Sequence, residues 1–331
     1  MRVLVTGGAG FIGSYVIEYL HKETDWDIIC IDKLSYATKG WKRLQDSNLL
    51  NSSRIKNFTW DLQIPFSDGL MIELGDINLI IHMAAETHVD KSIKEPVQTI
   101  QNNVMSTVYL LEYARKLPHL EIFQYFSTDE VFGPAPQGVA YKEWDRHRPT
   151  NPYSASKSAS EDICLAYHNT YNIPIIITNM MNAFGSSETI FQHVEKFIPK
   201  CIKKILNDET IVIHTEPDGR TPGTRHYISL QNIASAVLFI LKNVKIGEKI
   251  NITGELEIDN LELAQKIAKI IGKELKYECV DTHVDRPGHD TRYCLDGSKL
   301  FELGWTLESS FDEHLEETVK RTLANPSWLQ D

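Results

Sequence analysis

Cysteine is scarce in this sequence and is not arranged for metal binding or cross-linking. The five cysteines are scattered over 331 residues, are odd in number, and include neither a CxxC pair nor a mixed His/Cys ligand spacing. Zinc sites and disulfide frameworks are therefore poor interpretations, and we expect no metal in the functional site. A reducing compartment, the cytoplasm, fits this cysteine usage best.

Long apolar runs and basic runs are also missing. No apolar span approaches the roughly 18 residues that a membrane-crossing helix needs, and Met1 leads directly into a strand-like run rather than a leader-like segment. Acidic residues outnumber basic ones 45 to 34, which gives a net charge of −11. We therefore expect neither a membrane nor nucleic acid as a partner, and an anionic ligand would need locally concentrated cations.

What the sequence does contain is a glycine-rich turn between a predicted strand and a predicted helix. Residues 2–6 form an apolar run, and Gly7, Gly10 and Gly13 follow it. Glycines at these places allow a tight turn and a close approach of a pyrophosphate to the backbone, with the amino end of the helix facing the phosphates. A glycine-rich structural turn is the alternative. The agreement of strand, loop and helix favours a dinucleotide site.

The second predicted strand, residues 27–31, supports that interpretation because it ends in a carboxylate. Asp32 lies 19 residues after Gly13, about where an acidic residue accepts hydrogen bonds from an adenosine ribose and repels a 2′-phosphate. NAD is therefore favoured over NADP. Lys33 keeps the alternative open, because a cation beside Asp32 could tolerate the extra phosphate.

Two adjacent acids follow another predicted strand. The apolar, aromatic run 123–126 leads at once into Ser127, Thr128, Asp129 and Glu130. In an open parallel sheet, ligands bind beyond the carboxyl ends of the strands, where this pair would point. An isolated Asp-Glu pair is more commonly an acidic surface turn. Its place downstream of a dinucleotide loop favours a catalytic role.

A Tyr and a Lys share one face of the next predicted helix. Tyr153 and Lys157 follow Asn151-Pro152 and stand four residues apart. A nearby ammonium lowers the pKa of a phenol, so the pair can remove a proton from an alcohol as hydride leaves for a nicotinamide. Alone the spacing is common; after a dinucleotide loop and a hydroxyl-bearing strand end it indicates redox chemistry.

The alternation of strands and helices weakens after residue 178. We predict an α/β fold in which residues 1–178 form a Rossmann doubly wound parallel sheet that binds NAD. Residues 179–331 are expected to form mainly a smaller, interleaved substrate domain, with a return segment at about 226–245. Lys196, Arg225 and Arg286 are candidate ligands for a nucleoside diphosphate, although a solvated surface charge is the alternative for each.

Five segments together resemble the extended short-chain dehydrogenase/reductases, and within them the dTDP-glucose 4,6-dehydratases. They are VTGGAGFIGS at 5–14, AAETHVDKSI at 84–93, STDEVFG at 127–133, NPYSASKSASE at 151–161 and DRPGHDTRY at 285–293. The first and fourth are typical of the broad group. The Thr-Asp-Glu sequence and residues 286–290 are more specific to the dehydratases.

This resemblance implies a catalytic cycle. Tyr153 takes the proton from the hydroxyl on sugar carbon 4 while NAD accepts hydride, with Thr128 bound to that oxygen and Lys157 holding Tyr153 ionised. Glu130 acts as the base on carbon 5 and Asp129 as the acid for the hydroxyl leaving carbon 6; hydride then returns to carbon 6. Asp129 needs a raised pKa for this work, to which burial and the neighbouring carboxylate would both contribute.

The resemblance also implies the binding residues. Those for NAD are Gly7, Gly10, Phe11, Ile12, Gly13, Asp32, Lys33, Leu34, Ser35, Asp61, Leu62, Ala84, Ala85, Thr87, Tyr153 and Lys157. Those for the nucleoside-diphosphate hexose are Thr87, Thr128, Asn182, Lys196, Arg225, Asn251, Arg286 and His289. The sequence departs from the usual family pattern at Phe132, at 182–185 and at 216–226, mostly in the substrate half, so the nucleotide and the hexose stay open.

The leading hypothesis is therefore an NAD-dependent nucleotide-sugar 4,6-dehydratase acting on dTDP-glucose, with UDP-, CDP- or GDP-linked hexoses as variants. One alternative is a nucleotide-sugar 4-epimerase or decarboxylase, against which Asp129 argues. A second is a non-catalytic NAD-binding sensor, which would have no use for the five catalytic candidates together. We also expect a homodimer, because helices 97–116 and 154–170 pair across a dimer in this group.

Overall fold

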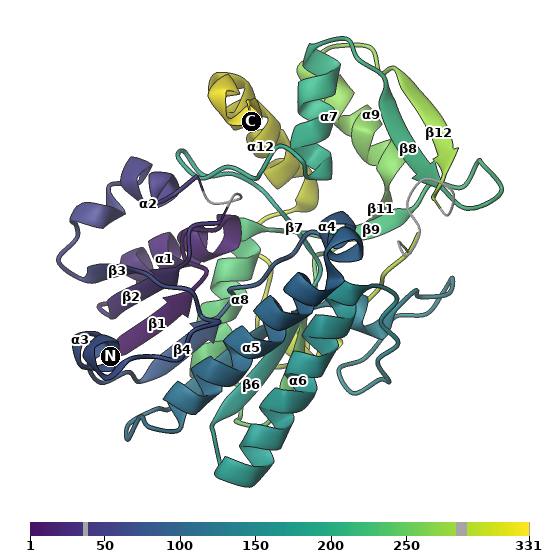
Figure 1. The fold of residues 1–331 in the computed structure, drawn as a ribbon. Helices are drawn as coiled ribbons and strands as arrows, with labels where there is room; N and C mark the ends of the chain where they lie inside the picture. Colours follow the sequence, from purple (N-terminus) through teal and green to yellow (C-terminus); the bar gives the residue numbers. More distant parts are fainter. Residues whose placement is uncertain (36–38, 283–289, 331) are drawn as a thin grey trace.

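A computed structural model describes residues 1–35, 39–282 and 290–330. Its main element is a seven-stranded parallel sheet of order β10-β6-β5-β4-β1-β2-β3 (Figure 1). The strands are β1 (Arg2–Thr6), β2 (Asp27–Asp32), β3 (Ile55–Thr59), β4 (Leu79–His82), β5 (Ile122–Thr128), β6 (Ile175–Met180) and β10 (Lys249–Ile252). The order reverses between β1 and β4, as in doubly wound dinucleotide-binding sheets, so the predicted fold class is confirmed.

Helices cover both faces of this sheet because its inner strands are apolar on both sides. Val3 and Val5 of β1 face α1 (Phe11–Glu23) and α8 (Leu230–Asn243), whereas Leu4 joins the core on the other face. That second face is covered by α3 (Asp68–Leu74), α5 (Pro96–Ala114) and α6 (Pro152–Tyr171). Near-continuous apolar strands of this kind are expected where a parallel sheet is buried on both faces.

A smaller region lies beyond the carboxyl ends of the main strands (Figure 1). It contains a three-stranded sheet, β11-β9-β7, and a two-stranded sheet, β12-β8, around a separate apolar core. The strands are β7 (Asn182–Phe184), β8 (Ile211–Thr215), β9 (Thr224–Ser229), β11 (Glu257–Asp259) and β12 (Tyr277–Asp281), and the helices are α7 (Phe197–Leu206), α9 (Asn260–Ile271) and α12 (Phe311–Ala324). This region can therefore face a ligand that lies on the main sheet.

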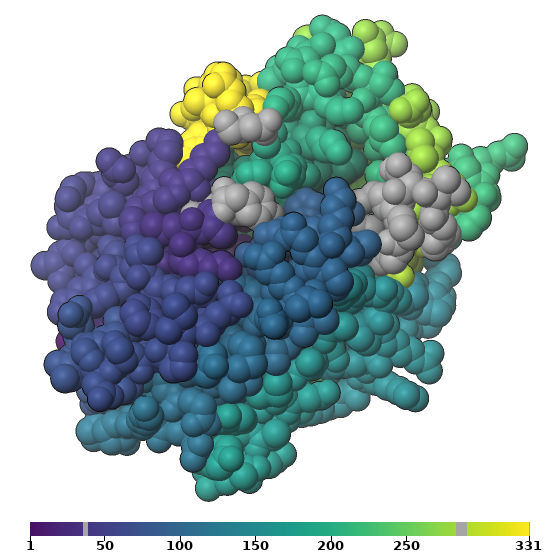
Figure 2. Space-filling model, in the orientation of Figure 1, coloured from purple at the N-terminus to yellow at the C-terminus, as the bar shows by residue number. Residues whose placement is uncertain are grey.

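Short helices complete the fold: α2 (Lys42–Asp46), η2 (Leu49–Asn51), α4 (Val89–Lys94), η3 (Asp129–Phe132), α11 (Ser298–Glu302) and η4 (Pro326–Leu329). The carboxyl-terminal η4 lies beside the amino-terminal part of the chain on the face shown in Figure 2, where yellow and purple atoms meet. Arg43 of α2 stands 5.3 Å from the centre of the Trp328 ring. No helix among the described residues is long and apolar enough to cross a membrane.

The chain returns to the main sheet after it has entered the smaller region. Helix α8 packs against α1, and β10 then pairs with β6, with Lys249 opposite Ile177. The return segment, expected at about 226–245, thus continues to Ile252. The division of the chain at residue 178 stays a prediction.

Candidate active site

A cavity of about 360 Å³ opens where β1, β2, β4, β5 and β6 end. The predicted site residues that line it are Gly7, Gly10, Phe11, Ile12, Gly13, Asp32, Lys33, Ser35, Asp61, Leu62, Ala84, Ala85, Thr87, Thr128, Asp129, Glu130, Tyr153, Lys157, Asn182 and Lys196. Leu34, Arg225 and Asn251 do not line it. Arg286 and His289 lie outside the described residues.

At the glycine turn after β1, two glycines lie so close to neighbouring backbone that neither has room for a side chain. Gly7 has φ of +72°, and a Cβ placed on it would stand 2.9 Å from the Cα and N of Ala84. A Cβ on Gly13 would overlap the carbonyl oxygen of Gly7. Only glycine combines this backbone angle with this contact. The turn therefore leaves the amino end of α1 open to a phosphate group, as a bound dinucleotide requires.

Asp32 is oriented by the backbone on both sides of it. The carboxylate is only 7% exposed, and it accepts hydrogen bonds from the Ala9 amide at 3.1 Å and the Leu34 amide at 2.8 Å. Burial raises the pKa of Asp32 and these two amides oppose the shift. Leu34 thus contributes through its backbone rather than by lining the cavity.

Lys33 does not stand beside Asp32 as an unpaired cation. Its ammonium donates to Asn102 Oδ1 at 2.5 Å and forms an ion pair with Glu86 at 3.3 Å. This arrangement favours the NAD alternative, because the charge that could accept a 2′-phosphate is already engaged.

The acid pair sits on a short turn that β5 enters directly. Thr128 caps the turn, and its hydroxyl donates to Asp129 Oδ1 at 2.9 Å. Asp129 is 4% exposed, and its Oδ2 has no hydrogen-bond partner among the described residues. Burial, followed by the Glu130 carboxylate, raises the pKa of Asp129 from 3.8 to about 7. The predicted upward shift is confirmed, whereas the role as acid stays a prediction.

Glu130 is held by two side chains from distant segments. Asn151 Nδ2 donates to Glu130 Oε2 at 3.1 Å, and the Tyr293 hydroxyl donates to the same oxygen at 3.4 Å. Burial raises the pKa of Glu130, while Asn151 and the charge of Arg225 oppose the shift. Neither Asn151 nor Tyr293 was predicted as a site residue. Asn151 could have been noticed because it directly precedes Pro152, which starts a helix. Tyr293 could have been noticed because it is the last residue of the DRPGHDTRY segment.

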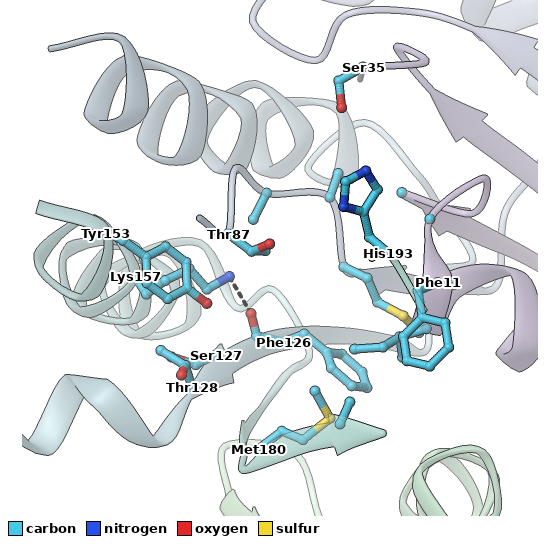
Figure 3. Close-up of a pocket in the computed structure, with 18 of the residues that line it drawn as sticks. Phe11, Ser35, Thr87, Phe126, Ser127, Thr128, Tyr153, Lys157, Met180 and His193 are labelled. Carbon is cyan, nitrogen blue, oxygen red and sulfur yellow. Dashed lines mark hydrogen bonds between the residues drawn. The ribbon is translucent and has the colours of Figure 1, made fainter. Parts of the chain in front are cut away.

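Tyr153 and Lys157 both reach the cavity from the first turns of α6 (Figure 3). The Lys157 ammonium donates to the carbonyl oxygen of Phe126 in β5, the dashed line in Figure 3. Burial lowers the pKa of Lys157 to about 8. Burial and then the Glu130 carboxylate raise the pKa of Tyr153. The expectation that Lys157 lowers the phenol pKa stays a prediction.

Arg225 supports the acid pair from outside the cavity. Its guanidinium donates to the carbonyl oxygens of Thr224, Thr291 and Asp290 at 2.7, 2.6 and 2.6 Å. Its charge still lowers the pKa values of Asp129 and Glu130 from where burial would put them. Arg225 does not line the cavity, and its contact with a substrate stays a prediction.

Asn251 is also absent from the cavity. It is fully buried in β10, and its Nδ2 donates to the carbonyl oxygens of Tyr141 at 3.0 Å and Asp296 at 2.9 Å. The structure therefore gives Asn251 a role in joining three segments, in place of the predicted substrate contact.

The cavity has further residues that were not predicted from the sequence. Ser127, Met180, Gln192 and His193 line it, and Figure 3 shows His193 across the cavity from Tyr153 and Lys157. Ser127 stands inside the acid motif, which was a usable signal. Gln192 and His193 lie in a segment without regular structure, so no periodicity pointed to them.

A buried ion pair lies behind the acid turn. Lys249 Nζ stands 2.7 Å from Glu161 Oε2, with the two side chains 3% and 0% exposed. Asn179 Nδ2 donates to Glu161 Oε1 at 2.7 Å and to the Thr128 carbonyl oxygen at 3.3 Å. The pair is thereby joined to the strand end that carries the acids.

One group of potential metal ligands occurs among the described residues. His226, Glu257 and Cys294 place ligand atoms within 4.8 Å of one another. Arg292 engages the Glu257 carboxylate through two hydrogen bonds of 2.6 and 2.9 Å. The carboxylate is thus already neutralised by a cation.

Comparison with known proteins places this geometry among nucleotide-sugar enzymes. The protein-family model described as GDP-mannose 4,6-dehydratase matches residues 4–318. The dTDP-glucose 4,6-dehydratase of Haemophilus influenzae is 35% identical and aligns over 99% of each chain. That of Escherichia coli is 33% identical, over 100% of this chain and 95% of the other.

Solved structures agree with these relatives. The dTDP-glucose 4,6-dehydratase DesIV of Streptomyces venezuelae, crystallised with NAD, has a TM-score of 0.87 and 31% identity, over 100% of this chain and 99% of that one. UDP-glucuronic acid 4-epimerase of Bacillus cereus, in complex with UDP-glucuronic acid and NAD, has a TM-score of 0.85 and 27% identity, over 98% of this chain and 100% of that one. Both dehydratases and epimerases therefore share this fold.

Proposed function

Since the chain belongs to the protein family described as GDP-mannose 4,6-dehydratase, we propose that it is an NAD-dependent nucleotide-sugar 4,6-dehydratase, a hydro-lyase acting on dTDP-glucose. The products are dTDP-4-keto-6-deoxyglucose and water. Support for dTDP-glucose comes from relatives of that activity that are 33% and 35% identical over almost the whole chain.

The observation that carries the proposal is the difference between the two neighbouring carboxyl groups. Asp129 is buried, and its pKa of about 7 lets it hold a proton near neutral pH. Burial raises the pKa of Glu130 as well, but its two hydrogen-bond donors oppose that rise and favour the ionised form. One acid and one base side by side are what an elimination needs, and an exchange of configuration at carbon 4 has no use for them.

The chain offers a fitting site for the cofactor. The Gly7–Gly13 turn is proposed to hold the pyrophosphate, Asp32 the adenosine ribose, and Lys157 the nicotinamide ribose. When bound, NAD would supply the hydride acceptor and a positive charge. Burial raises the pKa of the Tyr153 phenol, so a nearby positive charge would help it to act as a base.

The proton steps are assigned to three side chains, with Thr128 as a hydrogen-bonding neighbour. Tyr153 takes the proton from the hydroxyl on carbon 4, and the resulting ketone acidifies the hydrogen on carbon 5. Glu130 removes that hydrogen, and Asp129 protonates the hydroxyl leaving carbon 6. The Thr128 hydroxyl donates its hydrogen bond to Asp129 in this structure. To contact the oxygen on carbon 4, it must either accept a hydrogen bond from that oxygen or rotate to donate one.

The sugar nucleotide is proposed to lie across the cavity toward the smaller region. Thr87, Asn182 and Lys196 line the cavity and are its candidate ligands. Arg286 and His289, which lie outside the described residues, complete the proposed set by the resemblance of their segment. The lysine and arginine supply the local positive charge that a diphosphate needs in a protein of net charge −11.

An oligomeric state and a compartment are proposed from exposed apolar residues and from the cysteines. We propose a homodimer formed through α5 and α6, because Val97 and Ile100 of α5 are 66% and 42% exposed. The five cysteines are all free, which supports a reducing cytoplasm. Sedimentation of the purified protein, with Val97→Glu as the test variant, checks the dimer.

The test of the function is a panel of nucleoside-diphosphate hexoses followed by mass spectrometry. A 4,6-dehydratase yields a product lighter by one water, with dTDP-glucose converted fastest. A 4-epimerase yields an isomer of unchanged mass, and a sensor yields no conversion although NAD is bound. Either of the last two results for every member of the panel contradicts the proposal.

A further inference from the structure

The Glu130 carboxylate is anchored through only one of its two oxygens. Asn151 Nδ2 and the Tyr293 hydroxyl both donate to Oε2, at 3.1 and 3.4 Å. No hydrogen bond from a described residue reaches Oε1, and Glu130 lines the cavity. We infer that Asn151 and Tyr293 are positioning residues that fix Glu130 so that Oε1 is the atom that takes the proton from sugar carbon 5. This inference rests on the proposed function.

Asn151 can hold Glu130 because its own amide is fixed. Its Oδ1 accepts from the Ser154 amide at 2.9 Å, as the cap of α6, so the remaining Nδ2 must point away from the helix. The side chain is 5% exposed. Since α6 also carries Tyr153, one residue sets the position of the base on carbon 5 relative to the base on the carbon 4 hydroxyl.

Tyr293, the second donor to Glu130 Oε2, is itself held in place. Its ring is 4% exposed and lies 4.8 Å from the guanidinium carbon of Arg225, which is bonded to three backbone carbonyls. Burial and the charge of Glu130 raise the pKa of Tyr293, so the phenol keeps its hydrogen and serves as a donor. Tyr293 is not among the residues that line the cavity.

Two donors on Oε2 have a specific chemical effect. They stabilise the ionised carboxylate and restrict rotation of its plane, so the opposite oxygen keeps one direction. Removing a donor should therefore slow proton removal from carbon 5 while leaving oxidation at carbon 4 nearly unchanged. A residue that only stabilised the fold would not separate these two steps.

The test compares Asn151→Ser, Tyr293→Phe and the control Ser154→Ala. Serine keeps an N-cap oxygen but loses the donor to Glu130, and phenylalanine keeps the ring beside Arg225 but loses the hydroxyl. Ser154→Ala breaks the capping box and leaves both donors to Glu130 intact. Each variant is assayed with dTDP-glucose carrying deuterium at carbon 4 or at carbon 5, and its bound NAD is measured.

The expected result is a fall in kcat of about tenfold for Asn151→Ser and for Tyr293→Phe, the size of one hydrogen bond to a charged group. In both, the isotope effect from carbon 5 grows, that from carbon 4 shrinks, and bound NAD is unchanged. Ser154→Ala keeps the wild-type isotope effects.

Two results overturn the inference. One is wild-type kcat and isotope effects in both donor variants. The other is a loss in Asn151→Ser that Ser154→Ala reproduces with unchanged isotope effects, which is the mark of a purely structural cap. If the wild type removes water from no nucleotide sugar, the proposed function fails and this inference falls with it. If the wild type dehydrates and the variants do not respond, only the inference fails.

Discussion

The Thr128 hydroxyl donates a hydrogen bond to Asp129 Oδ1 at 2.9 Å, while Asp129 Oδ2 is buried without a hydrogen-bond partner among the described residues. A carboxylate with one satisfied oxygen and one bare oxygen in a buried place is costly when ionised. The protonated acid, with its hydrogen on Oδ2, carries no charge and so lowers that cost. This arrangement favours the protonated form of Asp129 at the end of β5.

Asp129→Asn should separate oxidation from elimination. Asparagine preserves the shape and can accept the Thr128 hydrogen bond, but it cannot deliver a proton to a departing hydroxyl. Loss of general acid catalysis lowers turnover by roughly 10²–10⁴-fold, while NAD stays bound. Product formation by mass spectrometry and cofactor content of the purified variant are the measurements. Full dehydratase turnover in Asp129→Asn would remove the assigned role.

The pH dependence of turnover should show the same acid. Because burial and Glu130 raise the pKa of Asp129 to about 7, the proton-bearing form prevails below that pH and is lost above it. We expect kcat to fall as pH rises through about 7, and this limb to disappear in the residual activity of Asp129→Asn. A profile that is flat from pH 6 to about 9 in the wild type would be incompatible with Asp129 as the acid.

The glycine turn provides a matched pair of variants for cofactor binding. In Gly7→Ala, the new Cβ would lie 2.9 Å from the Ala84 backbone, and the residue would also have to keep a left-handed backbone conformation. In Gly272→Ala only the left-handed conformation is unfavourable, because nothing lies within 4 Å of the new Cβ. Gly272→Ala should cost about 1–2 kcal/mol of unfolding free energy and keep NAD. Gly7→Ala should lose NAD. Equal NAD content in the two variants would show that the close approach to Ala84 is unimportant.

The buried ion pair of Lys249 and Glu161 should affect the free energy of unfolding, because removing one partner leaves the other charge uncompensated. Lys249→Met leaves Glu161 buried without its cation, which costs about 3–5 kcal/mol of unfolding free energy. Adding Glu161→Gln removes the uncompensated charge and should restore most of the loss. Urea unfolding of the single and double variants measures this. A double variant less stable than Lys249→Met would contradict the explanation.

Much of the fold and part of the site could be predicted because local patterns and sheet geometry determine them. Apolar strands that alternate with helices require a parallel sheet, and the residues that follow such strands must gather at one edge, which is why Asp32 and Asp129 line one cavity. The raised pKa of Asp129 was predictable for the same reason, since burial and a neighbouring carboxylate both raise the pKa of an acid.

The remaining features depend on contacts between distant segments. Tyr293 reaches Glu130 across 163 positions of the chain, and no periodicity encodes that contact. Arg225 and Asn251 have the chemistry of ligands, yet backbone carbonyls of other segments occupy their donors. The direction of the Lys157 ammonium depends on the position of the Phe126 carbonyl. Residue type and spacing alone cannot supply these facts.

In the proposed reaction, a ketone at carbon 4 permits an acid and a base on one turn to remove water from carbons 5 and 6. The most direct measurement is the fate of deuterium placed on carbon 4 of dTDP-glucose, read by NMR of the product. We expect the label on carbon 6 of a 4-keto-6-deoxy sugar. Label retained on carbon 4 of an isomer of the starting sugar would contradict it.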